Sequence, residues 1–365
     1  MPPLIGVNCA RLANPATLAR ALDLGLAAVV DLPGPHARSV GVVGDVLRSR
    51  PGDAPRLVAK VGYCAAADAP AGAAAVDGAV SHGLHDAAWT AAQVARTAEA
   101  LGRPVDVALL HNPEEVGDGA RRGDAVAAAA AAIRAAGAAR AVGVSTNDVA
   151  WLATLDDVAV ARVPAHALDA PAARAAQAAL GARAEVLGFG PFRAATASSF
   201  RRLASPPPGA FDPADYVAAS SRLVAHFTPG DGADDETREG CAWVTQLVSD
   251  LNGSLPRFEA FEQWELEITT QLVPMLHAKF EELDEDSADL LMAFFAAYGA
   301  AVRASADAAT RELARAAPSP LGDGEALEAW ALRDVAARPG LAAVLVALEA
   351  PEDADALAAL LAGLP

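Results

Sequence analysis

Short apolar segments alternate with alanine-rich segments along most of this chain, and this alternation constrains the fold more than any other feature. The apolar segments are typical of β-strands, and they lie at residues 4–7, 28–31, 57–61, 105–111, 141–145, 158–163, 186–189 and 343–348. Helical patterns separate most of them, for example at residues 15–24, 87–101 and 124–135. Strands that alternate with helices predict right-handed β–α–β units and a parallel sheet.

The strands are apolar at consecutive residues rather than at every second residue, which predicts burial on both faces. Eight such units within 365 residues predict an α/β fold, a (β/α)8 TIM barrel.

The alternation stops after Phe192, and about 130 residues separate the seventh strand from the eighth. Apolar residues in this segment, such as Trp243, Leu247 and Leu251, recur at steps of three and four residues, which predicts amphipathic helices. The helical patterns lie at residues 216–226, 238–251, 258–283 and 287–317. We therefore expect one barrel domain in three pieces, with strands one to seven in residues 1–192, a helical insert on the barrel rim in 193–324 and the last β/α unit in 325–365.

The formal net charge of −18 argues against nucleic acid and anionic membrane surfaces as partners, because both would repel the chain. Three cysteines lie far apart, with neither a disulfide framework nor zinc-site spacing. The first residues show no signal-peptide pattern, and no long apolar run predicts a membrane span. These features predict a cytoplasmic protein.

Ionisable residues close three neighbouring strands. Asp31 ends the second strand, Lys60 ends the third and His111 ends the fourth. Lys60 is one of only two lysines beside 26 arginines, and lysine, unlike arginine, changes its pKa readily when it is buried. In a parallel barrel the active site lies where strands end, so we expect the three side chains to converge. The residues alone leave open whether this group is catalytic or a structural ion pair with a hydrogen-bonded histidine.

At these segments the chain resembles the aldo-keto reductases. The resemblance rests on residues 22–31, on Ala59-Lys60, on the segment from Asp106 to Glu114 (Asp-Val-Ala-Leu-Leu-His-Asn-Pro-Glu), on 142–147 and on 338–352. It covers residues 1–192 and about 325–365, in matching order. The insert is similar to that of a less-studied branch of the family.

The resemblance implies a catalytic group of Asp, Tyr, Lys and His, with Asp31, Lys60 and His111 in three of these roles. The tyrosine, which protonates the substrate carbonyl, would fall five residues after Asp31, where this chain has His36. A histidine can also act as a general acid. The residues leave open whether His36 replaces the tyrosine or catalysis has been lost.

The resemblance also implies an NAD(P)H site. Ser145, Thr146 and Asn147 lie where the family holds the nicotinamide, and Arg162 replaces a glutamine there. Phe192, just past Phe189-Gly190-Pro191, is a further candidate near the nicotinamide, although packing is the commoner role of such an aromatic residue. Glu349 lies where the family presents a basic residue to the adenosine phosphate. A carboxylate repels a 2′-phosphate, so NADP is disfavoured relative to NAD, or the dinucleotide is not bound.

Three functions follow as hypotheses. The first is an aldo-keto reductase-like oxidoreductase that transfers hydride between NAD(P)H and a carbonyl or sugar-like alcohol. The second is a catalytically degenerate protein of this fold that acts in binding or assembly, with the insert contacting a protein partner. The third is a Schiff base at Lys60, against which the neighbouring Asp31 argues because it would keep the lysine protonated. His82 and His85 have no third ligand at a clear spacing, so we expect no metal site.

Overall fold

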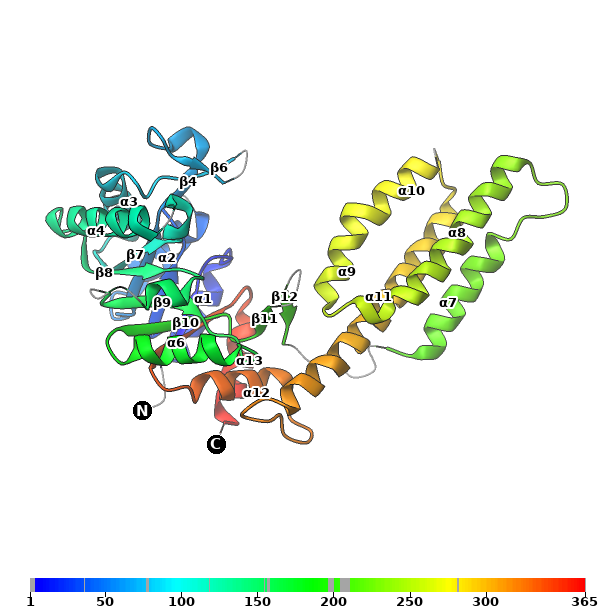
Figure 1. Cartoon of the computed structure of the whole chain (residues 1–365). Coiled ribbons are helices and arrows are strands. Elements are labelled where there is room, and N and C mark those ends of the chain that lie inside the picture. Colours follow the sequence, from blue (N-terminus) through cyan, green and yellow to red (C-terminus); the bar gives the residue numbers. More distant parts are fainter. Residues whose placement is uncertain are drawn as a thin grey trace. The chain divides into compact units, whose positions relative to one another are not determined.

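The computed structural model describes residues 4–35, 37–76, 79–117, 119–153, 155, 158–195, 200–203, 211–280 and 282–364. The chain forms two compact units (Figure 1). The first unit comprises residues 1–191 and 331–365, and the second comprises residues 192–330.

Eight parallel strands of the first unit close into a barrel, in the order β1-β13-β10-β9-β8-β7-β3-β2. Their bounds are β1 Leu4–Asn8, β2 Val29–Leu32, β3 Arg56–Val61, β7 Val105–His111, β8 Ala139–Ser145, β9 Val160–Pro164, β10 Glu185–Phe189 and β13 Leu341–Ala347. The predicted (β/α)8 barrel, with a helical segment between its seventh and eighth strands, is confirmed.

Helices alternate with these strands. They are α1 Pro15–Asp23, α2 Arg38–Ser49, α3 Ala87–Leu101, α4 Gly119–Ala135, α5 Val149–Leu152, α6 Pro171–Gly181, α12 Leu327–Ala336 and α13 Pro351–Ala362. Local chemistry sets several of their ends. The Asn14 side chain accepts a hydrogen bond from the Ala16 N–H at the start of α1, and Gly102 ends α3 in the left-handed conformation. Among the described helices, none has the length and apolar character needed to cross a bilayer.

A small antiparallel sheet follows the third barrel strand, and the sequence patterns did not predict it. It consists of β4 Tyr63–Ala65, β5 Ala74–Ala75 and β6 Val80–His82, paired in the order β4-β6-β5. Strands of two or three residues are too short for a recognisable apolar pattern. Tyr63 closely follows the strand that carries Lys60, and His82 pairs with Tyr63 in this sheet.

The second unit begins with a hairpin and continues in helices. Its elements are β11 Arg193–Ala195, β12 Phe200–Arg202, α7 Pro213–His226, α8 Asp235–Ser254, α9 Phe261–Glu267, the π-helical η4 Ile268–Leu272, α10 Val273–Lys279 and α11 Glu285–Arg315. Its core is aromatic, with Trp264 and Tyr298 rings 4.7 Å apart between their centroids. The Tyr298 hydroxyl donates to the Leu251 carbonyl oxygen at 2.6 Å, so this buried phenol is hydrogen-bonded.

The segment predicted as one helix over residues 258–283 differs in detail. The helix runs from Phe261 to Lys279 and widens to a π-helix at Ile268–Leu272. Pro274 follows this wide turn and has no N–H to donate, which accounts for the interrupted α-helical pattern. The prediction that the insert covers a barrel rim stays a prediction.

One close approach inside the barrel gives a test of its packing. A Cβ atom added at Gly143 in β8 would lie 2.2 Å from the Val160 carbonyl oxygen and 2.9 Å from Leu109 Cδ2. We therefore expect Gly143→Ala to destabilise the barrel by about 1–3 kcal/mol or more. In α2, Gly41 has no atom within 4 Å of an added Cβ, so Gly41→Ala should stabilise by up to about 1 kcal/mol. Urea unfolding midpoints measure both, and equal shifts for the two variants would contradict this packing.

Candidate active site

Inward-facing residues near the carboxyl ends of six successive barrel strands form one layer. They are Asp31 in β2, Lys60 in β3, His111 in β7, Ser145 in β8, Arg162 in β9 and Phe189 in β10. Side chains alternate along a strand, so the residue two positions earlier also faces inward. Five of those earlier residues belong to one buried apolar cluster, namely Val29, Val58, Leu109, Val160 and Leu187. The polar layer therefore lies on an apolar floor.

A carboxylate shared by two cations is at the centre of this layer. Lys60 Nζ lies 2.7 Å from Asp31 Oδ1, and Arg162 Nε lies 2.9 Å from Asp31 Oδ2. The side chains are 0%, 5% and 6% exposed for Asp31, Lys60 and Arg162, so water screens these charges little. With Lys60 protonated, the three groups carry one net positive charge.

The pKa of Lys60 reflects this shared carboxylate. Burial and the positive charge of Arg162 lower the pKa of Lys60 to about 8, although the contact with Asp31 opposes the change. The ammonium form still prevails at neutral pH. Because Asp31 also neutralises Arg162, it compensates Lys60 less than a carboxylate with a single partner would.

His111 lies next to the charged network and is neutral at physiological pH. In the register of the barrel strands, His111 is paired with Ser145 in β8, and Ser145 is paired with Arg162 in β9. Burial, followed by the positive charges of Lys60 and Arg162, lowers the pKa of His111 well below its ordinary value. A neutral imidazole keeps one N–H donor and one acceptor nitrogen.

Tyr63 contacts His111 from the small sheet. The Tyr63 ring centroid lies 5.0 Å from that of His111 and 4.8 Å from that of His82. Asn112 Nδ2 donates to the Tyr63 hydroxyl oxygen at 2.9 Å, which leaves the phenolic hydrogen free to be donated elsewhere. Burial raises the pKa of Tyr63. The sequence patterns did not single out this phenol.

Buried polar contacts hold the Tyr63 segment in place. The Gln93 side chain accepts from the Gly62 N–H at 3.0 Å and donates to the Tyr63 carbonyl oxygen at 3.2 Å. His82 Nε2 lies 2.7 Å from the His111 carbonyl oxygen, and burial lowers the pKa of His82. Gly62 has a φ of +134°, and an added Cβ would lie 3.1 Å from His82 Nε2, so glycine is required there.

Cys9 is a second residue near this site that the sequence did not mark. It follows β1, it is fully buried, and its N–H donates to the Asp31 carbonyl oxygen at 2.8 Å. Burial, together with the charge of Asp31, raises the pKa of the Cys9 thiol well above its ordinary value. The thiol is therefore protonated and acts as a small apolar group rather than a nucleophile.

Three of the proposed nicotinamide residues lie at the end of β8. The Ser145 hydroxyl accepts from Arg162 Nη1 at 3.3 Å and retains its own hydrogen for donation. The Thr146 hydroxyl donates to Glu114 at 2.8 Å, and the Asn147 N–H donates to the same carboxylate at 3.2 Å. The Asn147 side chain is exposed. Ser145 and Asn147 therefore retain donors that fit a carboxamide.

The positive charge of Arg162 suits the reduced nicotinamide ring better than the oxidised ring. Its guanidinium lies 3.8 Å above the Phe189 ring, in the layer that carries one net positive charge. The oxidised nicotinamide ring is a cation, so this charge opposes it, whereas the reduced ring is neutral. Gly190, which follows β10, has a φ of +74°. The proposed Phe192 is the first residue of the second unit, whereas Phe189 belongs to the barrel itself.

Glu349 Oε1 lies 3.2 Å from Arg11 Nη1, with side chains 58% and 60% exposed, so the pair is a weak surface contact without net charge. His36 lies outside the described residues. His85 Nε2 contacts the Ala71 carbonyl oxygen at 2.9 Å. Within the described ranges, no three His, Cys, Asp or Glu side chains are grouped as metal ligands.

Solved structures of aldo-keto reductases are similar to this chain. The aldo-keto reductase AKR11C1 from Bacillus halodurans, in its holo form, is 14% identical with a TM-score of 0.53, and the match covers 99% of this chain and 87% of that chain. This is the aldo-keto reductase fold. The apo form of that protein is 13% identical with a TM-score of 0.43, covering 99% of this chain and 86% of that chain.

A further similar structure is that of a Pseudomonas aeruginosa protein named provisionally as an aldo-keto reductase. It is 22% identical with a TM-score of 0.41, over 53% of this chain and 75% of that chain. No protein-family model matches the sequence, and no curated protein matches it. At 14% identity the match to the holo form from Bacillus halodurans establishes the fold alone, and the chemistry depends on the site.

The lowered pKa of Lys60 predicts how stability changes with pH. Between about pH 8 and the ordinary lysine pKa of 10.5, the unfolded chain binds a proton that the folded chain lacks. Stability should therefore rise with pH across this window, by about 3 kcal/mol from this group. Urea unfolding at pH 7.5 to 10.5 measures the rise as the difference between the natural chain and Lys60→Met. Parallel pH profiles for the two proteins would contradict the lowered pKa.

Proposed function

We propose that the chain is an oxidoreductase of aldo-keto reductase type, which interconverts a small carbonyl compound and its alcohol with NADH favoured over NADPH. One observation carries the proposal: a buried network with one net positive charge lies beside a neutral histidine at the carboxyl end of a barrel. Active sites of such barrels lie at that end. The substrate class is an aldehyde, a ketone or a sugar-like alcohol.

The positive charge of the network stabilises the negative charge that develops on the substrate oxygen during carbonyl reduction. As the carbonyl carbon gains hydride, its oxygen becomes negative, and preorganised positive charge in a dry site stabilises it strongly. Lys60 and Arg162 carry two positive charges and Asp31 carries one negative charge, so one positive charge remains. The neutral His111 donates a hydrogen bond that orients the carbonyl oxygen. A bound reduced nicotinamide would supply the hydride, with Ser145 and Asn147 holding its carboxamide.

Two residues are candidates to donate the proton to the substrate oxygen. His36 follows β2 in the sequence and occupies the position that the resemblance gives to the tyrosine. Tyr63 offers a phenolic hydrogen, and its ring contacts that of His111. The contact with His111 favours Tyr63, because a donor has to reach the same oxygen that His111 orients.

A second candidate function is ligand binding or assembly without redox chemistry. It is favoured by Arg162, whose charge opposes an oxidised nicotinamide, and by Glu349, whose pair with Arg11 offers a 2′-phosphate no net positive charge. The second unit would then serve as the surface for a protein partner. We also propose a reducing, cytoplasmic setting for either function, which the free thiols of Cys9, Cys64 and Cys241 support.

A dinucleotide titration and a substitution at Lys60 together test the leading proposal. Titration with NADH and NADPH, followed by nicotinamide fluorescence, should show binding of NADH at micromolar concentration and weaker binding of NADPH. In a carbonyl screen, Lys60→Met should lower kcat/KM by at least about 100-fold, because it removes charge at the reacting oxygen. Lys279→Met, at the other lysine, should leave activity unchanged, because Lys279 pairs with Glu239 in the second unit.

Failure to bind either dinucleotide up to millimolar concentration would overturn the redox proposal and leave the second candidate. Binding without turnover of any carbonyl would do so as well.

The proton donor is tested by two single substitutions. Tyr63→Phe removes the phenolic hydrogen and keeps the ring, so we expect kcat to fall by about 100-fold or more with little change in cofactor affinity. His36→Ala should then have a small effect. A large loss in His36→Ala with full activity in Tyr63→Phe would assign the role to His36 instead.

A further inference from the structure

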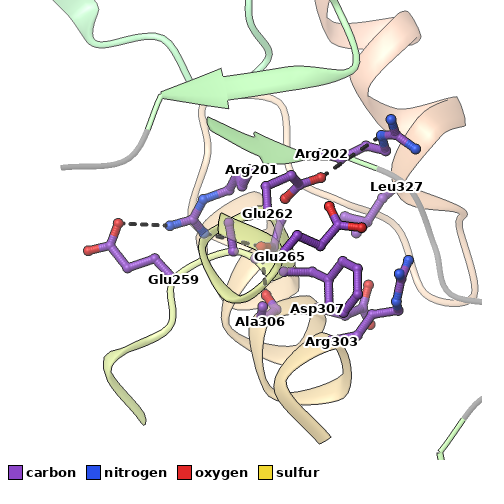
Figure 2. Close-up of a pocket in the computed structure, with 12 residues that line it drawn as sticks. Arg201, Arg202, Glu259, Glu262, Glu265, Arg303, Ala306, Asp307 and Leu327 are labelled. Carbon is purple, nitrogen blue, oxygen red and sulfur yellow. Dashed lines mark hydrogen bonds and ion pairs between the residues drawn. The ribbon is translucent and has the colours of Figure 1, made fainter. Parts of the chain in front are cut away.

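The second unit contains a cavity of about 130 Å3 with a strongly charged lining (Figure 2). Side chains reach it from β12, from the start of α9 and from α11. Three arginines and four acidic residues are among the lining residues. Small-molecule sites are usually lined mainly by apolar groups with a few polar ones, so this mixture of charges requires an explanation.

Arg201 supplies a buried cation to this cavity. Its side chain is 9% exposed, and burial lowers the pKa of its guanidinium. Nη1 donates to the Thr310 hydroxyl at 3.1 Å, whereas Nη2 lies 3.8 Å from Glu259 Oε2, which is too far for a hydrogen bond. A guanidinium has five N–H donors, and within the described ranges most of those of Arg201 lack an acceptor.

Asp307 supplies a partly buried anion with unused hydrogen-bonding capacity. Its Oδ2 accepts from Arg311 Nε at 2.9 Å. Its Oδ1 is buried and has no hydrogen-bond partner among the residues that the structure describes. A buried, unpaired carboxylate oxygen is costly, so a ligand that donates to it would be favoured.

The two charges lie close together on one face of α11. The Thr310 hydroxyl accepts a hydrogen bond from the Arg201 guanidinium, and Thr310 is three residues after Asp307. Residues three apart on a helix have Cβ atoms about 5–6 Å apart. The Arg303 guanidinium, on the same face, lies 3.7 Å above the Phe261 ring and covers another part of the lining.

We propose that this cavity binds a small α-amino acid as its zwitterion, with the carboxylate on Arg201 and the ammonium group on Asp307. A simple anion would meet four carboxylates in the lining, and a simple cation would meet the buried Arg201. A zwitterion with both charges on neighbouring groups satisfies both residues, and an arginine fork suits a carboxylate.

The size of the cavity limits the side chain of the ligand. Its 130 Å3 is close to the roughly 150 Å3 of an engineered protein cavity that binds benzene, so small amino acids such as glycine, alanine and serine fit the space better than large ones. Every lining residue belongs to the second unit, so the proposal does not rest on the redox function of the barrel.

Calorimetric titration of the full chain tests the proposal with glycine, L-alanine and L-serine. Propionate and ethylamine serve as analogues of alanine that each lack one charged group. At least one amino acid should bind, and each analogue should bind at least about tenfold more weakly than alanine, because it leaves Arg201 or Asp307 without its partner. No binding of the three amino acids up to millimolar concentration, or equal binding of propionate and alanine, would overturn the proposal.

Two substitutions locate the binding to this cavity. Arg201→Gln and Asp307→Asn should each lower the affinity for the amino acid by about tenfold or more. Arg238→Gln is the matched control, because Arg238 is 54% exposed on α8 and does not line the cavity. Circular dichroism of each variant monitors folding, and the comparison of analogues on the natural chain does not depend on any variant. Unchanged affinity in both cavity variants would contradict the assignment.

Discussion

The shared carboxylate of Asp31 is the interaction on which the candidate site depends. It joins Lys60 from β3 and Arg162 from β9 across the interior of the barrel, at 2.7 and 2.9 Å. Burying three charges costs free energy that only close, complementary contacts offset, and removing one partner would leave the others uncompensated. The apolar floor beneath the layer keeps these contacts dry and therefore strong.

Sharing one carboxylate between two cations has two chemical consequences. The layer carries an excess positive charge, which suits an oxygen that becomes negative during carbonyl reduction. The same charge opposes an oxidised nicotinamide, so the arrangement that supports the chemistry also weakens the fit to one state of the cofactor. His111 takes part without adding charge, because burial and the neighbouring cations keep it neutral.

The barrel and part of its site follow from the sequence, because eight apolar strands mark the sheet and their last residues mark its active end. Asp31 and Lys60 were predictable since each closes a strand, and neighbouring strands bring such residues together. The contact of Arg162 with Asp31 was not predictable, because it crosses the barrel between strands 131 residues apart in the chain. Tyr63 and the contact of His82 with His111 were missed because β4 and β6 are too short to show a pattern, and the cavity of the second unit depends on tertiary packing.

The most direct test of the shared carboxylate is the pKa of the Lys60 ammonium group, measured by NMR of the chain labelled with 15N-lysine. Only two lysines are present, so two signals suffice, and Lys279→Met assigns them. We expect Lys60 to titrate near pH 8 and Arg162→Gln to raise its pKa, because Asp31 would then compensate Lys60 alone. Titration of Lys60 near the ordinary lysine pKa, with no response to Arg162→Gln, would contradict the sharing of Asp31 by two cations.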